Sequence, residues 1–204
     1  MRAGTTRKNR FLASLVSLLL ILAAPLSAVQ AATSAMAVVK SAVNQALKII
    51  ADPKYKSAPE AERAELLKVL DADFDFKAMA HSSLGTQWKQ LNEDQRKRFE
   101  VAFQNFMEAR YVKIIESYSG QKIDFVKESS IGPDLSEVHT SVNSPMLQSP
   151  LDFNYQLRQE NGEWKVYDLV IAGISEVASY RNDFVKQLNR GGFDALMKKL
   201  ANPD

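Results

Sequence analysis

Three aspartates, Asp71, Asp73 and Asp75, have a spacing that could direct several carboxylate oxygens at a hard cation such as calcium. The remainder of a calcium-binding loop is missing. Its sixth position requires glycine and is Phe76, and its twelfth requires a bidentate glutamate and is Ser82. We therefore interpret the aspartates as groups that cap and flank a short helix, and we expect no metal ion.

Groups for acid–base or nucleophilic catalysis are also scarce. His81 and His139 are the only histidines, and neither has a partner at a recognised ligand or triad spacing. The chain contains no cysteine, no Gly-x-Ser-x-Gly elbow and no glycine-rich phosphate loop. Tyr167 and Asp168 are neighbours on a predicted strand, so their side chains point to opposite faces. The sequence favours a protein that is not an enzyme and needs no cofactor.

The helix predicted from Asn92 to about Tyr118 is the best candidate for a binding surface. Asn92 and Gln95 form a capping-box pattern at its start. Its apolar residues form a broad stripe, for which core packing is the default interpretation. Because methionine adapts to irregular shapes and tyrosine gives an apolar wall a polar end, a ligand pocket is the alternative. The stripe comprises Phe99, Phe103, Phe106, Met107, Tyr111, Ile114, Ile115 and Tyr118.

Other helices are predicted before and after this one. Apolar residues recur at intervals of three and four from Met36 to Ile50, and Asp52-Pro53 ends that helix. Glycines end two of the others, at Gly85 and at 191–192. The further helices are expected from residue 59 onward, within 71–84, from 175 or 179 to about 190, and at about 193–200.

Beyond the long helix the apolar pattern changes to every second residue, which predicts strands. Segments 123–125, 138–142 and 151–157 alternate in this way. Asn161-Gly162 predicts a tight hairpin turn. The returning strand, 164–171, is apolar on both faces, so we expect it at the centre of the sheet and covered on both sides. Helices, a meander of strands and further helices predict a single α+β domain with an antiparallel sheet.

The amino terminus is predicted to be a cleavable export signal. Basic residues without an acid precede an apolar run over residues 11–24, and small residues offer a cleavage site after Ala31. The run is shorter than the ~20 residues that span a membrane, so a retained anchor is the weaker alternative. We expect one exported domain over residues 32–204, held together by its core because it has no cysteine for disulfides.

Removal of residues 1–31 also changes the charge. It takes four of the 26 basic residues and no acid, which leaves 22 bases against 24 acids. A slightly acidic chain lacks the basic surface that a nucleic-acid partner requires. The run Arg96-Lys97-Arg98 is interpreted as a solvated helix face, with a docking patch for an acidic partner as the alternative.

Three segments together resemble the toluene-tolerance family, the Mla-type periplasmic phospholipid-binding proteins. They are FDFKAMAHSSLGTQW at 74–88, QRKRFEVAF at 95–103 and GEWKVYDLVIAGISEVASYRNDF at 162–184. The resemblance covers residues 36–200, and its most specific part is Trp164, Val166-Tyr167-Asp168 and Gly173-Ile174-Ser175 in that order. Two prolines within 144–150 interrupt the strand region and depart from the family pattern at the edge of the expected pocket.

The resemblance implies an NTF2-like cone with a deep apolar pocket between the sheet and the helices. It implies a periplasmic shuttle that carries phospholipid between an outer-membrane lipoprotein complex and an inner-membrane ABC transporter, and so maintains outer-membrane lipid asymmetry. Because relatives are linked to hopanoids, a hopanoid-related carrier is one alternative. A non-catalytic periplasmic interaction domain with a filled core is another.

The residues expected to line the lipid pocket come from the long helix and from the sheet. Which strand face meets the pocket is left open by the alternation alone. They are Phe103, Met107, Tyr111, Phe153, Tyr155, Tyr167, Leu169 and Ile171.

Overall fold

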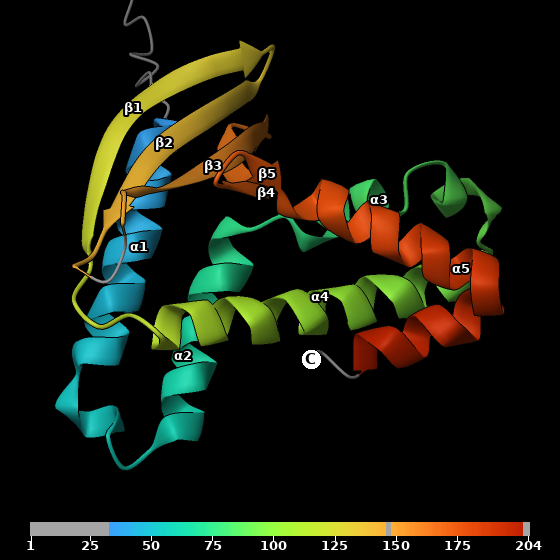
Figure 1. The fold of residues 1–204 in the computed structure, drawn as a ribbon, viewed down its shortest axis with the longest axis horizontal. Helices are drawn as coiled ribbons and strands as arrows, with labels where there is room; N and C mark the ends of the chain where they lie inside the picture. Colours follow the sequence, from blue (N-terminus) through green and yellow to red (C-terminus); the bar gives the residue numbers. More distant parts are fainter. Residues whose placement is uncertain (1–32, 146–147, 202–204) are drawn as a thin grey trace, which may run out of the picture. The chain divides into compact units, whose positions relative to one another are not determined.

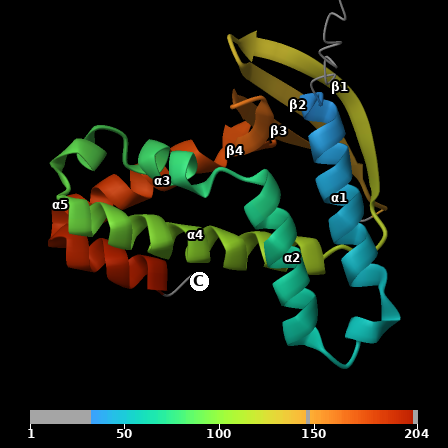
Figure 2. The same cartoon turned by 180° about the vertical axis from the view of Figure 1, so that it is seen from behind.

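The computed structural model describes residues 33–145 and 148–201, so the predicted export signal lies outside the described residues. These residues form the predicted α+β arrangement of helices and an antiparallel sheet (Figures 1 and 2). Within the described ranges no helix combines the length and apolarity needed to cross a membrane. The helices are α1 (Ala35–Ala51), α2 (Pro59–Asp73), α3 (Phe76–Leu84), α4 (Glu93–Glu116) and α5 (Glu176–Ala201), with short 3-10 helices η1 (Pro53–Tyr55) and η2 (Gly85–Gln90).

The helix ends follow local capping chemistry. The Asn92 side chain accepts a hydrogen bond from the Gln95 amide at 2.9 Å, and the Gln95 side chain accepts one from the Asn92 amide at 3.0 Å, which confirms the predicted capping box. Asp75 caps α3 by accepting from the Ala78 amide at 2.8 Å. The third helix therefore begins at Phe76 rather than at residue 71, because α2 continues to Asp73.

The sheet is a meander in which each strand pairs with the next one along the chain. Asn161 and Gly162 both have positive φ, 53° and 85°, and form the predicted turn between β3 and β4. Positive φ at both turn residues matches the twist of the strands, which explains the choice of Asn-Gly. The strands are β1 (Lys122–Gly132), β2 (Leu135–Asn143), β3 (Leu151–Glu160), β4 (Glu163–Ile171) and β5 (Ile174–Ser175).

Strand β4 does not lie at the centre of the sheet, and that prediction is wrong. It is the fourth of the five strands, and the only strand beyond it among the described residues is the two-residue β5, which pairs with Val170 and Ile171. Along the same strand, the Asp75 amide donates to the Val166 carbonyl at 2.8 Å, and Phe74 forms a parallel bridge with Val166. The segment between α2 and α3, together with α5, thus helps to cover this strand.

The main core lies among α3, α4 and α5, where α4 packs its amino-terminal half (Figure 1). Phe99 and Phe103 are fully buried, and both rings lie nearly perpendicular to the Phe184 ring, at centroid distances of 5.9 and 6.2 Å. The last turns of α4, from Tyr111 onward, reach the region beneath the sheet beside α1 and α2 (Figures 1 and 2). A helix of 24 residues is about 36 Å long, so α4 is long enough to extend from the helical core to the region beneath the sheet.

Candidate functional site

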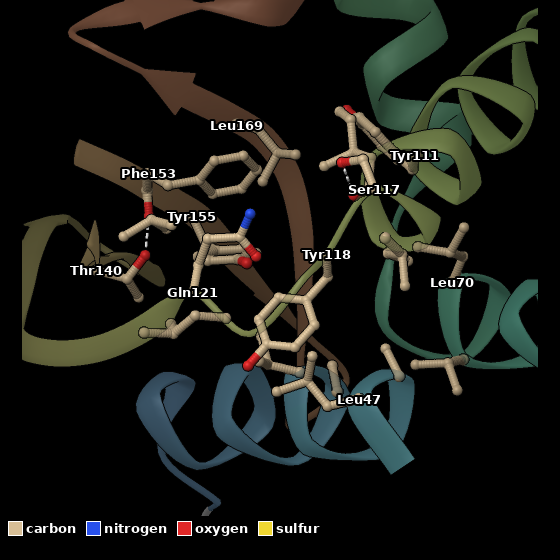
Figure 3. A pocket seen from close by; sticks show the side chains of 18 of the residues that line it. Leu47, Leu70, Tyr111, Ser117, Tyr118, Gln121, Thr140, Phe153, Tyr155 and Leu169 are labelled. Carbon is tan, nitrogen blue, oxygen red and sulfur yellow. Dashed lines mark hydrogen bonds between the residues drawn. The ribbon is translucent and has the colours of Figure 1, made fainter. Parts of the chain in front are cut away.

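A cavity of about 370 Å³ lies between the sheet and the helices α1, α2 and α4. This volume falls within the ~300–1,000 Å³ that is usual for ligand pockets. Figure 3 shows Phe153, Tyr155 and Leu169 on the sheet side, Tyr111 on α4, and Leu47 and Leu70 on α1 and α2. The lining residues are Ala42, Val43, Ala46, Leu47, Val69, Leu70, Phe74, Tyr111, Ile114, Ile115, Ser117, Tyr118, Gln121, Ile123, Thr140, Val142, Ser144, Leu151, Phe153, Tyr155 and Leu169.

The cavity wall is apolar, and among the described residues none that lines it is acidic or basic. Two of its hydroxyl groups are already bonded to the backbone. Ser117 Oγ donates to the Ile114 carbonyl at 2.7 Å, and the Thr140 hydroxyl donates to the Phe153 carbonyl. These bonds use the hydroxyl donors, so the wall presents mainly hydrocarbon to an occupant.

Aromatic rings supply much of this wall. Phe153 and Tyr155 lie 5.4 Å apart between ring centroids, and Phe74 lies 5.3 Å from Tyr111. Burial raises the pKa of Tyr155, and burial followed by the charges of Glu176 and Asp168 raises that of Tyr111, so both phenols are neutral. Tyr155 lies inside the protein yet keeps accessible surface, because its ring faces the cavity.

Four of the residues predicted to bind lipid line the cavity: Tyr111, Phe153, Tyr155 and Leu169. Phe103 and Met107 do not line it, because both are fully buried at 0% exposure in the helical core. The aromatic stripe of α4 is continuous in sequence, but only its carboxyl-terminal end reaches the sheet. Core packing accounts for the first half of the stripe and pocket lining for the second.

Tyr167 and Ile171 are also outside the lining. In the β3–β4 ladder Gln156 pairs with Asp168 and Leu157 pairs with Val166, which leaves Tyr167 as the extra residue of a β-bulge. The bulge shifts the alternation of β4. Tyr167 lies near Glu137, and burial followed by the charges of Asp168 and Glu137 raises its pKa.

The helix α1 supplies lining residues that the sequence predictions missed. Ala42, Val43, Ala46 and Leu47 form one side of the cavity. Val43 and Ala46 belong to the apolar stripe that predicted this helix, and the small side chains of the alanines leave space beside the sheet. The sequence signal that could have identified this side of the cavity is the pair of alanines, Ala42 and Ala46, because larger side chains on this face of α1 would fill the space beside the sheet.

The residues first considered for chemistry have separate structural partners. Asp75 pairs with Arg158 at 2.6 Å, and Asp71 accepts from Gln104 at 2.9 Å. The part of the chain that the structure describes holds no cluster of acidic, His or Cys side chains suited to a metal. His81 lies 2.7 Å from Glu100, and its ring centroid lies 4.0 Å from that of Trp88.

The remaining candidates are structural as well. His139 Nε2 lies 3.3 Å from Glu137. Asp168 is buried and accepts from the Val177 amide at 3.1 Å and from the Ser175 hydroxyl, which caps α5. Within the basic run, Arg96 Nε donates to the Trp88 carbonyl at 3.2 Å, so this arginine is packed against η2 rather than only solvated.

Comparison with known proteins identifies the family. Residues 40–202 match the MlaC protein family. The chain belongs to this family. It is 31% identical over 160 residues to the intermembrane phospholipid transport system binding protein MlaC of Haemophilus influenzae, with 75% of this chain and 70% of that protein aligned. It is 26% identical to the toluene tolerance protein ttg2D of Pseudomonas putida, over 69% of this chain and 66% of that protein.

The MlaC family fold is also found in a solved structure. A phospholipid-binding protein from Ralstonia solanacearum, determined in complex with a phospholipid, superposes with a TM-score of 0.71 at 24% identity. The match covers 82% of this chain and 95% of the Ralstonia chain. This agreement confirms the α+β fold with its antiparallel sheet.

Proposed function

We propose that this MlaC-family protein binds phospholipid in the periplasm and carries it between an outer-membrane lipoprotein complex and an inner-membrane ABC transporter. This traffic would maintain outer-membrane lipid asymmetry. The observation that carries the proposal is the cavity of about 370 Å³ whose described lining has no ionisable acid or base other than tyrosine. The name of the Haemophilus relative and the phospholipid in the Ralstonia structure support it.

The energetics of lipid tails explain why such a cavity serves transport. Each methylene moved out of water is worth about 0.8 kcal/mol, so a ~16-carbon chain alone in water costs on the order of 10 kcal/mol. An apolar cavity inside a soluble domain offsets this cost. We assign tail contact to Tyr111, Phe153, Tyr155 and Leu169, with Val43 opposite them on α1.

A binding role accounts for the site better than catalysis. Acid–base chemistry requires titratable groups that converge on the substrate. Asp168, which is next to Leu169 of the cavity wall, accepts a hydrogen bond from the Val177 amide near the start of α5 and does not line the cavity. We therefore propose a carrier without catalytic residues, in line with the phospholipid-transport name of the Haemophilus relative.

The location in the periplasm rests on the amino terminus. Residues 1–31 combine basic residues, an apolar run and small residues, as export signals do. We propose cleavage near Ala31, which leaves residues 32–204 as the working domain. Mass spectrometry of the protein recovered from a periplasmic extract would give the mature amino terminus, and an uncleaved chain would contradict this assignment.

The binding proposal is tested with protein purified from the periplasm of a Gram-negative host. Native mass spectrometry followed by lipid extraction should show bound phospholipid, and the delipidated protein should move a labelled phospholipid between two vesicle populations. Heat-unfolded protein is the control for transfer through vesicle collisions. Recovery of hopanoids instead of phospholipid would identify a different cargo. The absence of both bound lipid and lipid transfer would refute the proposal.

A further inference from the structure

A second, polar hollow of about 380 Å³ adjoins the apolar cavity. Ser144 belongs to the lining of both, so the polar hollow lies next to one end of the cavity. That end also carries Ser117 and Gln121, close to the connection from α4 to β1. Its described lining consists of Gly120, Lys122, Asn143, Ser144, Pro145, Gln148, Ser149 and Pro150.

Two hydrogen-bond donors in the hollow are held by one carboxylate. Lys122 and Asn143 lie opposite each other in the β1–β2 ladder. Lys122 Nζ lies 2.8 Å from Asp124 Oδ1 and donates to Oδ2 at 3.0 Å, while Asn143 Nδ2 donates to the same Oδ2 at 3.2 Å. Asp124 is not part of the lining, so it positions the two donors from one side.

Donor capacity remains on both side chains. The ammonium has three N–H groups and the amide has two, and Asp124 has only two oxygens to share between them. The Lys122 side chain is 75% exposed, and Lys122 carries the one charge among the described residues of the hollow. Gly120 adds open backbone, because a Cβ built there would meet no atom within 4 Å.

We propose that this hollow binds the phosphodiester of the phospholipid whose tails occupy the apolar cavity, with Lys122 Nζ and Asn143 Nδ2 donating to the phosphate oxygens. The proposal rests on the proposed function. The boundary at Ser144 between apolar and polar walls corresponds to the boundary between acyl tails and headgroup. A cation with free donors on the polar side is what a phosphate needs, since charge-assisted hydrogen bonds are the stronger ones.

The test compares two short-chain lipids with identical tails, a phosphatidylglycerol and a diacylglycerol, by calorimetric titration of the delipidated protein. Lys122→Gln should weaken phosphatidylglycerol binding about fivefold, because an exposed charge pair contributes on the order of 1 kcal/mol. Diacylglycerol binding should not change. Asn143→Ala should act in the same direction with a smaller effect. Lys127→Gln, at an exposed lysine of β1 outside the hollow, is the matched control.

Three results would overturn the inference. The first is that Lys122→Gln leaves the binding of both lipids unchanged or weakens both equally. Inorganic phosphate alone, without tails, could bind as tightly as the phospholipid, which would make the hollow a free-anion site. If the wild-type protein bound neither lipid, the proposed function would fail first and this inference with it, so the two failures are distinguishable.

Discussion

Filling the cavity should raise the stability of the free protein and lower its affinity for lipid. Ala42 on α1 lines the cavity, and its replacement by phenylalanine places a ring in the space that we assign to an acyl chain. The ring adds about six apolar carbons, which displace about the same number of methylenes, each worth ~0.8 kcal/mol. Complete exclusion of those methylenes would cost about 5 kcal/mol, and rerouting of the chain would reduce the loss.

We expect a net loss of about 2–4 kcal/mol for Ala42→Phe, which corresponds to an affinity lower by roughly 30- to 1,000-fold. The unliganded variant should gain stability, because the ring becomes buried in the cavity instead of leaving it empty. Thermal unfolding of the delipidated protein and titration with a short-chain phospholipid measure the two effects. They have opposite signs, which general damage to the fold cannot produce.

Ala64→Phe is the matched control, since Ala64 is exposed on α2 and outside the cavity. It carries the same helix-propensity cost of roughly 0.5 kcal/mol. Unchanged lipid affinity in Ala42→Phe, together with a raised melting temperature, would refute the assignment of this cavity to the tails. An equal loss of lipid affinity in Ala42→Phe and Ala64→Phe would refute the claim that the ring lowers affinity by occupying the cavity.

Three further predictions concern the scaffold. Phe103→Leu should destabilise the fold by about 1–2 kcal/mol in urea unfolding without changing lipid affinity, because this ring packs in the helical core; a large loss of affinity would contradict its exclusion from the lining. Asn92→Ala should cost about 1 kcal/mol by the same measurement, since it removes the cap of α4. Burial, followed by the hydrogen bond and the charge of Asp71, raises the pKa of Glu108. Glu108 therefore binds its proton more tightly in the folded protein than in the unfolded chain. Its contribution to the free energy of unfolding falls as the pH rises above the ordinary carboxyl range. Urea unfolding should therefore show Glu108→Gln gaining more, relative to wild type, at pH ~7 than at pH ~4.

Local signals in the sequence were sufficient for much of the fold. The capping box of Asn92 and Gln95 and the Asn161-Gly162 turn depend on neighbours within a few residues, and both formed as predicted. Gly192, the second glycine of the pair that predicted two helices, has a φ of 68° and interrupts α5. Such features need no knowledge of distant contacts.

The candidate site was only partly predictable because it depends on contacts between distant segments. Periodicity identified the stripe of α4, but the point at which it leaves the helical core for the sheet is set by α3 and α5. The bulge at Tyr167 shifts the alternation of β4, so the prediction that Tyr167 lines the pocket fails. No glycine or proline in this strand marks the position of the bulge. Tyr111 and Leu169 reach the cavity from segments far apart in the chain, which alternation within one segment cannot reveal.

The bonded hydroxyls of the cavity wall have a consequence for selectivity. The hydroxyl groups of Ser117 and Thr140 donate hydrogen bonds to backbone carbonyls, and the wall around them is mainly apolar. A mainly apolar wall of this kind discriminates between occupants by only ~1–3 kcal/mol per methylene. Acyl chains of similar bulk should therefore be accepted as a mixture, and preference for a lipid class falls to the groups at the mouth of the cavity.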